Sequence, residues 1–491
     1  MRDNHSSRMV HAGFPKINLL SREGLNEIHR ATLSLLSNTG IRISSNKAAA
    51  LFKSAGAVVV KDNLSAIVKI PPNLVDESIA AAPGELVYQG REAASDYAVN
   101  TDSCSFTTFG ECTNIIDLKT RTCRPSTKAD CCESAAICDC IGSVKVLERP
   151  LNPSDCPVET QALHNTEAIF TNTTKHSFIG PGSAEIFKQM AHMAEICVGG
   201  SREYAERKIF TATVCPVSPL TLSKDCCEII MEAAAQKTGL LIFAMPLSGA
   251  TSASTMAGTL VSLNAEILSG LILAQLSQKG TPCTYGSAGT IMDLTMVDVA
   301  LGAPEMTLLS AGAAQLARHY NLPSMICGGM TDSKVPDSQM GYEFGYSAML
   351  CALARGNLIS GLGVLDKGLT FDYAKLLMDV EMSQTISGLI PGMEISPETL
   401  ALNVINEVGP GGEFLTHKHT FKHMRNQSQV KIFDRQSRYD WDEAGSRSSA
   451  DRAYEEATLI LSKHKPAPLP GRAPEELSEL IRNYESRLSL T

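Results

Sequence analysis

The 491-residue chain is poor in positive charge, in aromatic side chains and in long apolar runs. Its formal net charge of -9 at pH 7 provides no positive field for a phosphate backbone, which argues against nucleic acid as a partner. The most apolar runs, residues 239–245 and 267–276, are too short to span a bilayer, and residues 1–30 contain no signal-peptide core. We therefore expect a cytoplasmic protein that binds neither nucleic acid nor a membrane.

Cysteine and histidine are present without the spacings of common metal sites. The densest group of the 15 cysteines, Cys131, Cys132, Cys138 and Cys140, contains no Cys-x-x-Cys pair, so we expect reduced structural thiols. The one histidine cluster, at 417–423, has no carboxylate at the zincin spacing. We expect no bound metal.

Short apolar or β-branched runs recur through the middle of the chain, and most are separated by helix-like segments. Eight such runs predict eight strand–helix units and hence a (β/α)8 TIM barrel over residues 101–400. An open doubly wound sheet is the competing fold, but the first run is not followed by a Gly-x-Gly-x-x-Gly turn. The runs are 105–109, 143–147, 177–179, 209–214, 240–245, 282–285, 324–326 and 358–362.

The two flanks have different patterns. Residues 1–100 predict an N-terminal α+β extension, with a helix capped by Ser21 and a strand at 64–70. Residues 401–491 predict a C-terminal helical region that packs on the barrel. Its last helix, 474–488, is amphipathic and is expected to contact the body or another subunit, so we expect a homo-oligomer.

The active site of such a barrel lies where its strands end. These positions show no nucleophile with an adjacent base and no His-x-His motif. The segment from Gly328 to Glu343 is distinctive, because two glycines allow a tight turn and Asp332, Lys334 and Asp337 follow on a loop interrupted by proline. We interpret this loop as part of a site at the barrel mouth.

At this segment the chain resembles the trimethylamine methyltransferase family of corrinoid-dependent enzymes. Residues 215–220 and 285–287 are also similar to the ends of the family's fourth and sixth strands, and residues 256–270 to its segment after the fifth strand. With Phe109-Gly110 and the ending near Trp441, the resemblance extends over most of the chain. It implies a TIM barrel that moves a methyl group from a methylated amine to the cobalt of a corrinoid protein.

The resemblance also bears on the substrate. Founding members of the family carry pyrrolysine two residues before the first Asp of an Asp-x-Lys-Val-Pro-Asp motif, and here that position is Met330. A thioether forms no adduct with a tertiary amine. Members without pyrrolysine are associated with quaternary amines, so we expect glycine betaine as donor, with trimethylamine, proline betaine, carnitine or γ-butyrobetaine as alternatives.

A quaternary nitrogen leaves as a neutral amine and needs no general acid, so we expect a dry pocket that orients the donor. The resemblance suggests a loop that positions the methyl donor, formed by Gly329, Met330, Asp332, Lys334 and Asp337. The candidate substrate-binding residues are aromatic or polar: Phe109, Tyr285, Tyr342 and Phe371 as cage, Arg149 and His176 as carboxylate anchors, and Gln339 and Glu343 as further polar contacts.

The sequence contains no cobalamin-binding Asp-x-His-x-x-Gly motif. We therefore expect this chain to bind no cofactor of its own and to meet the corrinoid on a cognate partner protein. Two other functions remain open. One is a barrel hydrolase or lyase with a metal held by Asp332, Asp337 and the His417 group, and the other is a non-catalytic betaine-binding or corrinoid-docking protein.

Overall fold

A computed structural model describes residues 17–62, 65–100 and 103–488. Its centre is one eight-stranded sheet in the order β6-β19-β18-β15-β13-β11-β10-β9, in which all paired strands are parallel. All eight predicted runs are strands of this sheet, which confirms the prediction. The strands are β6 (Ser105–Thr108), β9 (Val146–Glu148), β10 (His176–Ile179), β11 (Phe210–Val214), β13 (Gly239–Ala244), β15 (Cys283–Ser287), β18 (Ser324–Cys327) and β19 (Leu358–Leu362).

The sheet closes on itself between β6 and β9. Thr107 Oγ1 donates to the carbonyl of Val146 at 2.8 Å and accepts from the amide of Glu148 at 3.1 Å. Just beyond the strands, the amide of Glu111 donates to the carbonyl of Arg149 at 3.0 Å. A closed barrel excludes the open doubly wound sheet.

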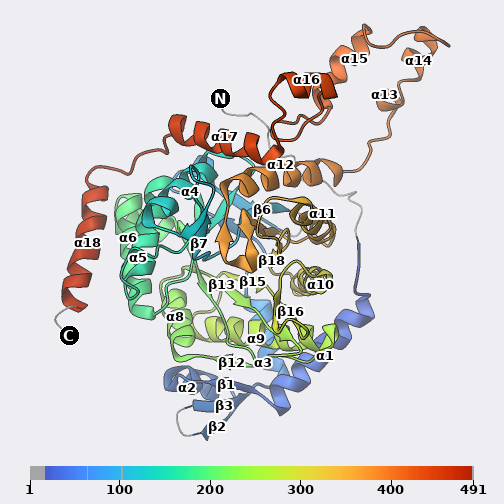
Figure 1. Cartoon of the computed structure of the whole chain (residues 1–491). Helices are drawn as coiled ribbons and strands as arrows, with labels where there is room; N and C mark the ends of the chain where they lie inside the picture. Colours follow the sequence, from blue (N-terminus) through green and yellow to red (C-terminus); the bar gives the residue numbers. More distant parts are fainter. Residues whose placement is uncertain (1–16, 63–64, 101–102, 489–491) are drawn as a thin grey trace.

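One main helix follows each barrel strand and packs outside it (Figure 1). Serine, threonine or aspartate caps several of these helices, as at Ser183, Ser223, Thr255 and Asp337, because each side chain accepts from an otherwise unpaired amide. The helices are α4 (Lys128–Cys140), α5 (Gln161–Asn172), α6 (Ala184–Val198), α8 (Lys224–Ala235), α9 (Met256–Ser277), α10 (Pro304–His319), α11 (Ser338–Leu353) and α12 (Tyr373–Leu389), with a short α7 (Ser201–Glu206) after α6.

Helix α9 is long and apolar enough to cross a membrane by length and composition. It is instead enclosed by the protein, with 72% of its most apolar window buried, because α1 and α3 cover one side and α8 and α10 flank it. A helix that is apolar all round is expected in such a position.

The N-terminal segment forms a layer over α9. Its sheet, β12-β1-β3-β2, includes β12 (Thr221–Leu222) from the loop after β11, and this strand ties the segment to the barrel. Ser21 caps the first helix as predicted, whereas the exposed strand β2 has no alternating apolar pattern and was not predicted. The elements are α1 (Arg22–Asn38), β1 (Ile41–Ile43), α2 (Asn46–Ser54), β2 (Val58–Asp62), β3 (Ser65–Lys69), α3 (Pro72–Ala81), β4 (Leu86–Tyr88), η1 (Ala93–Ser95) and β5 (Tyr97–Val99).

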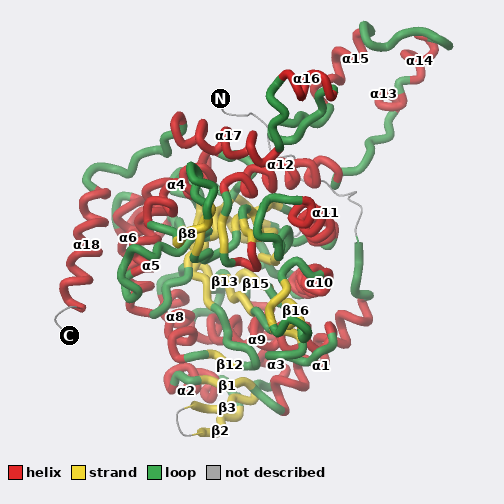
Figure 2. Tube along the Cα trace, viewed as in Figure 1, coloured by secondary structure: helices red, strands yellow, loops and turns green. Residues whose placement is uncertain are grey.

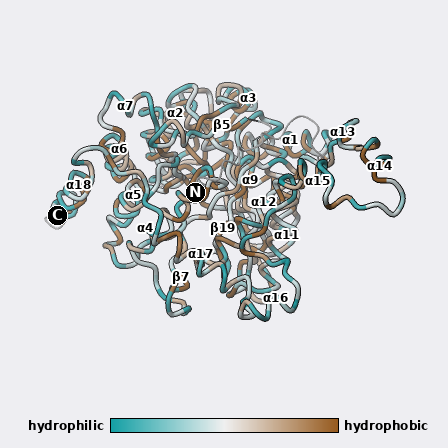
Figure 3. Tube along the Cα trace, turned by 90° about the horizontal axis from the view of Figure 1, so that it is seen from above, coloured by the Kyte–Doolittle hydropathy of each residue, from teal (hydrophilic) through white to brown (hydrophobic). Residues whose placement is uncertain are grey.

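After α12 the chain leaves the body as an arm, residues 390–447, and then returns (Figures 1 and 3). On its return α17 (Ser449–Lys463) packs on α12 and α4, and α18 (Ala473–Leu488) packs on α5 and α6. The arm contains α13 (Pro397–Leu400), α14 (Leu402–Val408), α15 (Lys418–His423), η3 (Met424–Asn426) and α16 (Arg438–Glu443). Division of the chain into separate units near residues 100 and 400 stays a prediction.

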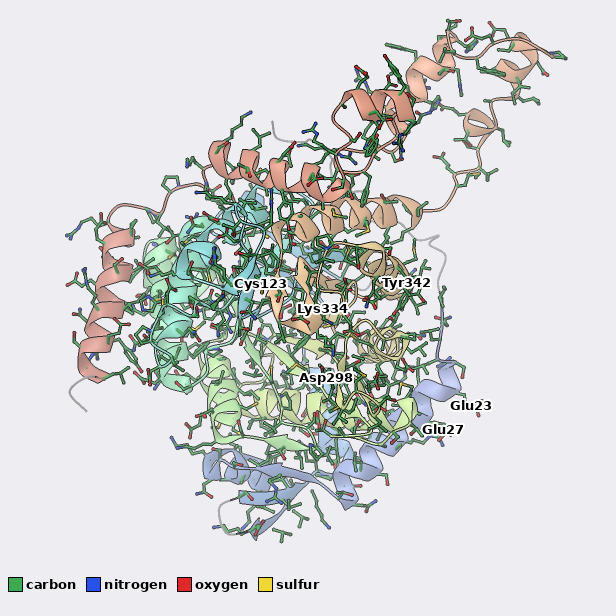
Figure 4. The ribbon with its side chains drawn as sticks, in the orientation of Figure 1. Glu23, Glu27, Cys123, Asp298, Lys334 and Tyr342 are labelled. Carbon is green, nitrogen blue, oxygen red and sulfur yellow. The ribbon has the colours of Figure 1, made fainter. Side chains whose placement is uncertain are left out.

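Short strands inserted after the barrel strands surround the mouth (Figure 2). Asp298 and Lys334 lie on this face, on neighbouring inserts (Figure 4). The inserted elements are β7 (Asn114–Ile116), β8 (Cys123–Pro125), β14 (Leu247–Ser248), β16 (Thr290–Asp293), β17 (Asp298–Ala300), β20 (Val364–Leu365), η2 (Asp366–Gly368) and β21 (Thr370–Phe371).

Candidate active site

Two aromatic rings meet across the barrel near its mouth. Phe109 follows β6 and Phe243 lies in β13, four places away along the eight-strand order in either direction, yet their ring centroids are 6.4 Å apart. Gly286 in β15 makes room for the ring of Phe243, since a Cβ at position 286 would lie 2.6 Å from Phe243 Cδ2. Phe109 was predicted, but Phe243 was not, because in the sequence it is one residue of a uniformly apolar strand.

A buried carboxylate, that of Glu148, lies at the end of β9. Its Oε2 is 2.6 Å from the hydroxyl of Ser360 in β19, and because β6 separates these two strands, both side chains are on the inner side of the wall. Burial raises the pKa of Glu148 to about 7. Among the described residues no Lys, Arg or His nitrogen forms an ion pair with it.

The next residue, Arg149, is a buried cation. It forms an ion pair with Glu111, and its Nη1 donates to the carbonyl of Gly180 at 3.5 Å. Its Nε is buried without a hydrogen-bond partner, and burial lowers the pKa of the guanidinium to about 10. An unpartnered buried N–H next to the mouth suits an anionic ligand.

The loop after β18 turns sharply at Gly329. This glycine has φ +84°, and a Cβ would lie 2.6 Å from the ring of Phe344. Its carbonyl accepts from Lys375 Nζ at 3.3 Å, and Lys375 is paired with Asp379 at 2.5 Å in a fully buried ion pair. The next residue, Met330, is 1% exposed. Gly329 and Met330 are thus held in one backbone geometry.

Asp332 and Glu343 fasten this loop to its neighbours. Asp332 Oδ1 accepts from the amide of Leu301 at 2.8 Å, and Glu343 Oε2 accepts from the amide of Asp332 at 2.9 Å and from the hydroxyl of Thr331. Gln339 Nε2 donates to Glu343 Oε1 at 2.9 Å. Burial raises the pKa of Asp332. These contacts position the loop and leave both carboxylates engaged.

Asp337 and Lys334 shape the same loop. Asp337 caps α11 by accepting from the amide of Met340 at 3.0 Å, which lowers its pKa, and it also accepts from Ser333 Oγ at 2.9 Å. Lys334 is 64% exposed on its side chain, donates to the carbonyl of Asp332 at 2.7 Å and pairs with Asp366 at 3.7 Å. The residue lies on the face that carries the inserted strands (Figure 4).

The structure does not bring the other aromatic candidates to Phe109. Tyr285 donates to Asn264 Oδ1 of α9 at 3.0 Å, so its ring lies between the barrel wall and the outer helices. Phe371 is buried against Gly363 and Tyr373. Tyr342 is 72% exposed on α11, beside Tyr346 (Figure 4). The sequence pattern does not distinguish rings that face the lumen from rings that face helices or solvent.

His176 lies at the opposite end of the barrel from the mouth. It begins β10, where its Nδ1 is 3.0 Å from the carbonyl oxygen of Gln89 and its Nε2 is 2.9 Å from Thr211 Oγ1. Burial lowers its pKa to about 4. Next to it, the Tyr88 hydroxyl is 2.7 Å from Thr284 Oγ1. His176 therefore helps to close the bottom of the barrel. It does not lie near Arg149, the other proposed carboxylate anchor.

The histidine cluster lies on the arm, far in the chain and in space from the loop after β18 (Figure 1). His417 Nδ1 accepts from the amide of His419 at 3.0 Å, as a helix cap. In the part of the chain that the structure describes, no three His, Cys, Asp or Glu side chains form a group that could hold a metal ion. The alternative that joins the His417 group with Asp332 and Asp337 around one metal is therefore wrong.

A closed (β/α)8 barrel with an aromatic pair and buried charges at its mouth is an architecture that many enzymes share, and comparison with known proteins gives the class of this one. The chain belongs to the trimethylamine methyltransferase (MTTB) family, whose match extends over residues 1–488. It is thus an enzyme of the methyltransferase type.

Individual relatives differ in their sequence identity to the chain. A trimethylamine methyltransferase of Desulfitobacterium hafniense is 40% identical over 482 residues, which cover 97% of each chain. A glycine betaine methyltransferase of the same species is 27% identical and covers 95% of this chain and 97% of that one. The solved hydroxylamine complex of MtmB has the same fold, with a TM-score of 0.54 at 12% identity over 90% of this chain and 89% of that one.

Proposed function

We propose that this enzyme moves a methyl group from a quaternary amine, with glycine betaine as the favoured donor, to the Co(I) of a separate corrinoid protein. The observation that carries this proposal is Met330. It occupies the pyrrolysine position implied by the family resemblance, and it is buried directly after the sharp turn at Gly329. A thioether there offers packing and no electrophile, so the donor has to be activated by its own positive charge.

The reaction needs few reactive groups from the protein. The N–CH3 bond breaks with its electron pair staying on nitrogen, which becomes a neutral amine, while the electron pair of Co(I) forms the new Co–CH3 bond. Because the leaving group is neutral, no proton has to be delivered in this step. What remains is to exclude water and to align one N–CH3 bond with cobalt. Phe109 and Phe243 provide aromatic faces for a methylated cation.

The carboxylate of a betaine fits Arg149. Its buried, unpartnered Nε supplies a donor, and its partner Glu111 is exposed and able to move away. A charge-assisted bond from a buried guanidinium would orient the donor along its length.

The cobalt has to reach the mouth on a partner, because the chain has no cobalamin-binding Asp-x-His-x-x-Gly motif. We propose that a cognate corrinoid protein docks over the inserts around the mouth, where Asp298 and Lys334 lie (Figure 4). We also propose that the protein is cytoplasmic and forms a homo-oligomer. The large apolar side chains that the arm exposes, among them Met393, Leu415 and Phe421, support the homo-oligomer.

A second donor has its own support. The relative that is 40% identical is a trimethylamine methyltransferase, whereas the glycine betaine enzyme is 27% identical. Overall identity thus favours trimethylamine, while the residue at position 330 favours a quaternary amine. We give the residue more weight because it lies in the proposed site.

The test is methylation of a cognate Co(I) corrinoid protein, followed by its absorbance, with glycine betaine, proline betaine, carnitine, γ-butyrobetaine and trimethylamine as donors. We expect methyl-Co(III) with a quaternary amine. The absence of a spectral change with every quaternary donor would overturn the proposal. Binding without methyl transfer would indicate a non-catalytic betaine-binding protein.

A further inference from the structure

We propose that Glu148 is the anionic anchor for the positively charged nitrogen of the methyl donor, neutral while the barrel is empty and ionised when the cation is bound. This inference rests on the proposed function and identifies how the site recognises charge. Glu148 is inside the barrel wall at the mouth end, 5% exposed, and bonded to Ser360 across β6.

Hydrogen-bond counting indicates where the proton is in the empty site. The Ser360 hydroxyl lies 2.8 Å from the carbonyl oxygen of Thr108 and 2.6 Å from Glu148 Oε2. A hydroxyl has one proton to donate, and the carbonyl oxygen can only accept. Both short contacts are satisfied if Glu148 carries a proton and donates it to Ser360 Oγ while Ser360 donates to Thr108. The neutral acid therefore fits the empty barrel.

Among the residues that the structure describes, no cation is paired with this carboxylate. The nearest arginine in sequence, Arg149, is turned to Glu111 and Gly180. Three thiols at other strand ends, those of Cys112, Cys215 and Cys327, interact with Glu148. Burial raises the pKa of Cys112 and Cys215 to about 12 and that of Cys327 well above its usual value, so all three are neutral near pH 7.

A quaternary ammonium would supply the missing charge. It carries no N–H, so its recognition needs an electrostatic partner together with aromatic faces. Glu148 and Arg149 are consecutive, which places a carboxyl group and a guanidinium at one strand end, one for each charge of a betaine. When the cation binds, Glu148 releases its proton to solvent. The consequence is a binding affinity that rises with pH as Glu148 ionises.

The experiment is calorimetric titration of the whole protein with tetramethylammonium, with glycine betaine and with 3,3-dimethylbutyrate, the uncharged-carbon analogue of glycine betaine. For the wild type we expect both quaternary ammonium compounds, tetramethylammonium and glycine betaine, to bind. We expect affinity for tetramethylammonium to rise roughly tenfold per pH unit up to about pH 7 and then to level off, with proton release. The carbon analogue should bind more weakly and without that pH dependence.

Two variants separate charge from structure. Glu148→Gln keeps the shape and should weaken tetramethylammonium binding at about pH 8 by roughly tenfold to a hundredfold, with the pH dependence lost. The matched control is Glu266→Gln, which removes another buried carboxylate, one bonded to Ser218 and Leu220 outside the barrel wall. It should bind as the wild type does. Ser360→Ala should keep a pH-dependent affinity with a shifted midpoint.

The outcomes distinguish the two proposals. If the wild type binds no quaternary amine, the proposed function fails. If it binds them and Glu148→Gln binds equally well at about pH 8, the role of Glu148 is refuted while the proposed function stands. In turnover, Glu148→Gln should raise KM without lowering kcat, because the positive charge on nitrogen is disappearing in the transition state. A lower kcat at unchanged KM would overturn the anchor.

Discussion

The two ends of the barrel are built from the same eight strands but differ in how their buried polar side chains are paired. At the closed end His176 is bonded to Gln89 and Thr211, and Tyr88 to Thr284, so each buried polar group has a partner. At the mouth Glu148 has no cationic partner and Arg149 Nε has none at all among the described residues. At one end of these strands the polar groups are therefore paired, and at the other a buried carboxyl group lacks a cation and a buried N–H lacks an acceptor.

This difference indicates which polar groups serve the fold and which serve a ligand. Satisfied polar groups stabilise a fold and need nothing from outside, whereas incomplete ones destabilise the empty protein and are completed by a ligand. Substitutions at the closed end should therefore lower stability and spare binding. Substitutions at the mouth should impair binding and can raise stability.

The largest expected effect is at Glu148. Its pKa is about 7 in the folded protein against an ordinary value of 4.5, so the folded state holds a proton that the unfolded chain has released. This contribution to stability is fully present below pH 4.5 and is lost as pH rises through about 7, by up to about 3 kcal/mol. Glu148→Gln should remove this pH-dependent loss and be relatively more stable at about pH 8 than at about pH 5.

Denaturant unfolding of both proteins at the two pH values measures this difference. An equal gap between wild type and variant at both pH values would mean that Glu148 is not held neutral in the empty barrel.

The next effect is at the closed end. His176→Leu leaves the Gln89 carbonyl and the Thr211 hydroxyl without partners and should lower the free energy of unfolding by about 2 kcal/mol. KM for the methyl donor should stay as in the wild type, because the residue is at the other end of the barrel. Urea unfolding and steady-state kinetics test the two halves of this expectation. A raised KM in a folded variant would indicate that His176 contributes to donor binding.

The smallest effect is at Tyr342. Its ring is 72% exposed on the outside of α11, so Tyr342→Ala should change stability by less than about 0.5 kcal/mol and leave donor binding unchanged. Calorimetric titration with glycine betaine checks the binding. A clear loss of affinity would place this ring in the cage after all and contradict the orientation seen here.

The sequence predicts the barrel strands well and the site only in part. The strand runs are recognisable because their side chains are buried on both faces, and the loop after β18 because its glycines and charges stand out. The lumen-facing role of Phe243 and the isolation of Glu148 depend on closure of the sheet, which brings residues far apart in the chain together. The orientations of Tyr285 and Tyr342 depend on packing with α9 and on exposure to solvent, which no local pattern encodes.

The measurement that tests the central claim most directly is competition between donors in one reaction. Equal concentrations of glycine betaine and trimethylamine are mixed with the enzyme and its Co(I) corrinoid protein, and the products are followed by proton NMR. A quaternary-amine enzyme with Met330 in its positioning loop should form dimethylglycine first. Dimethylamine as the faster product would contradict the account.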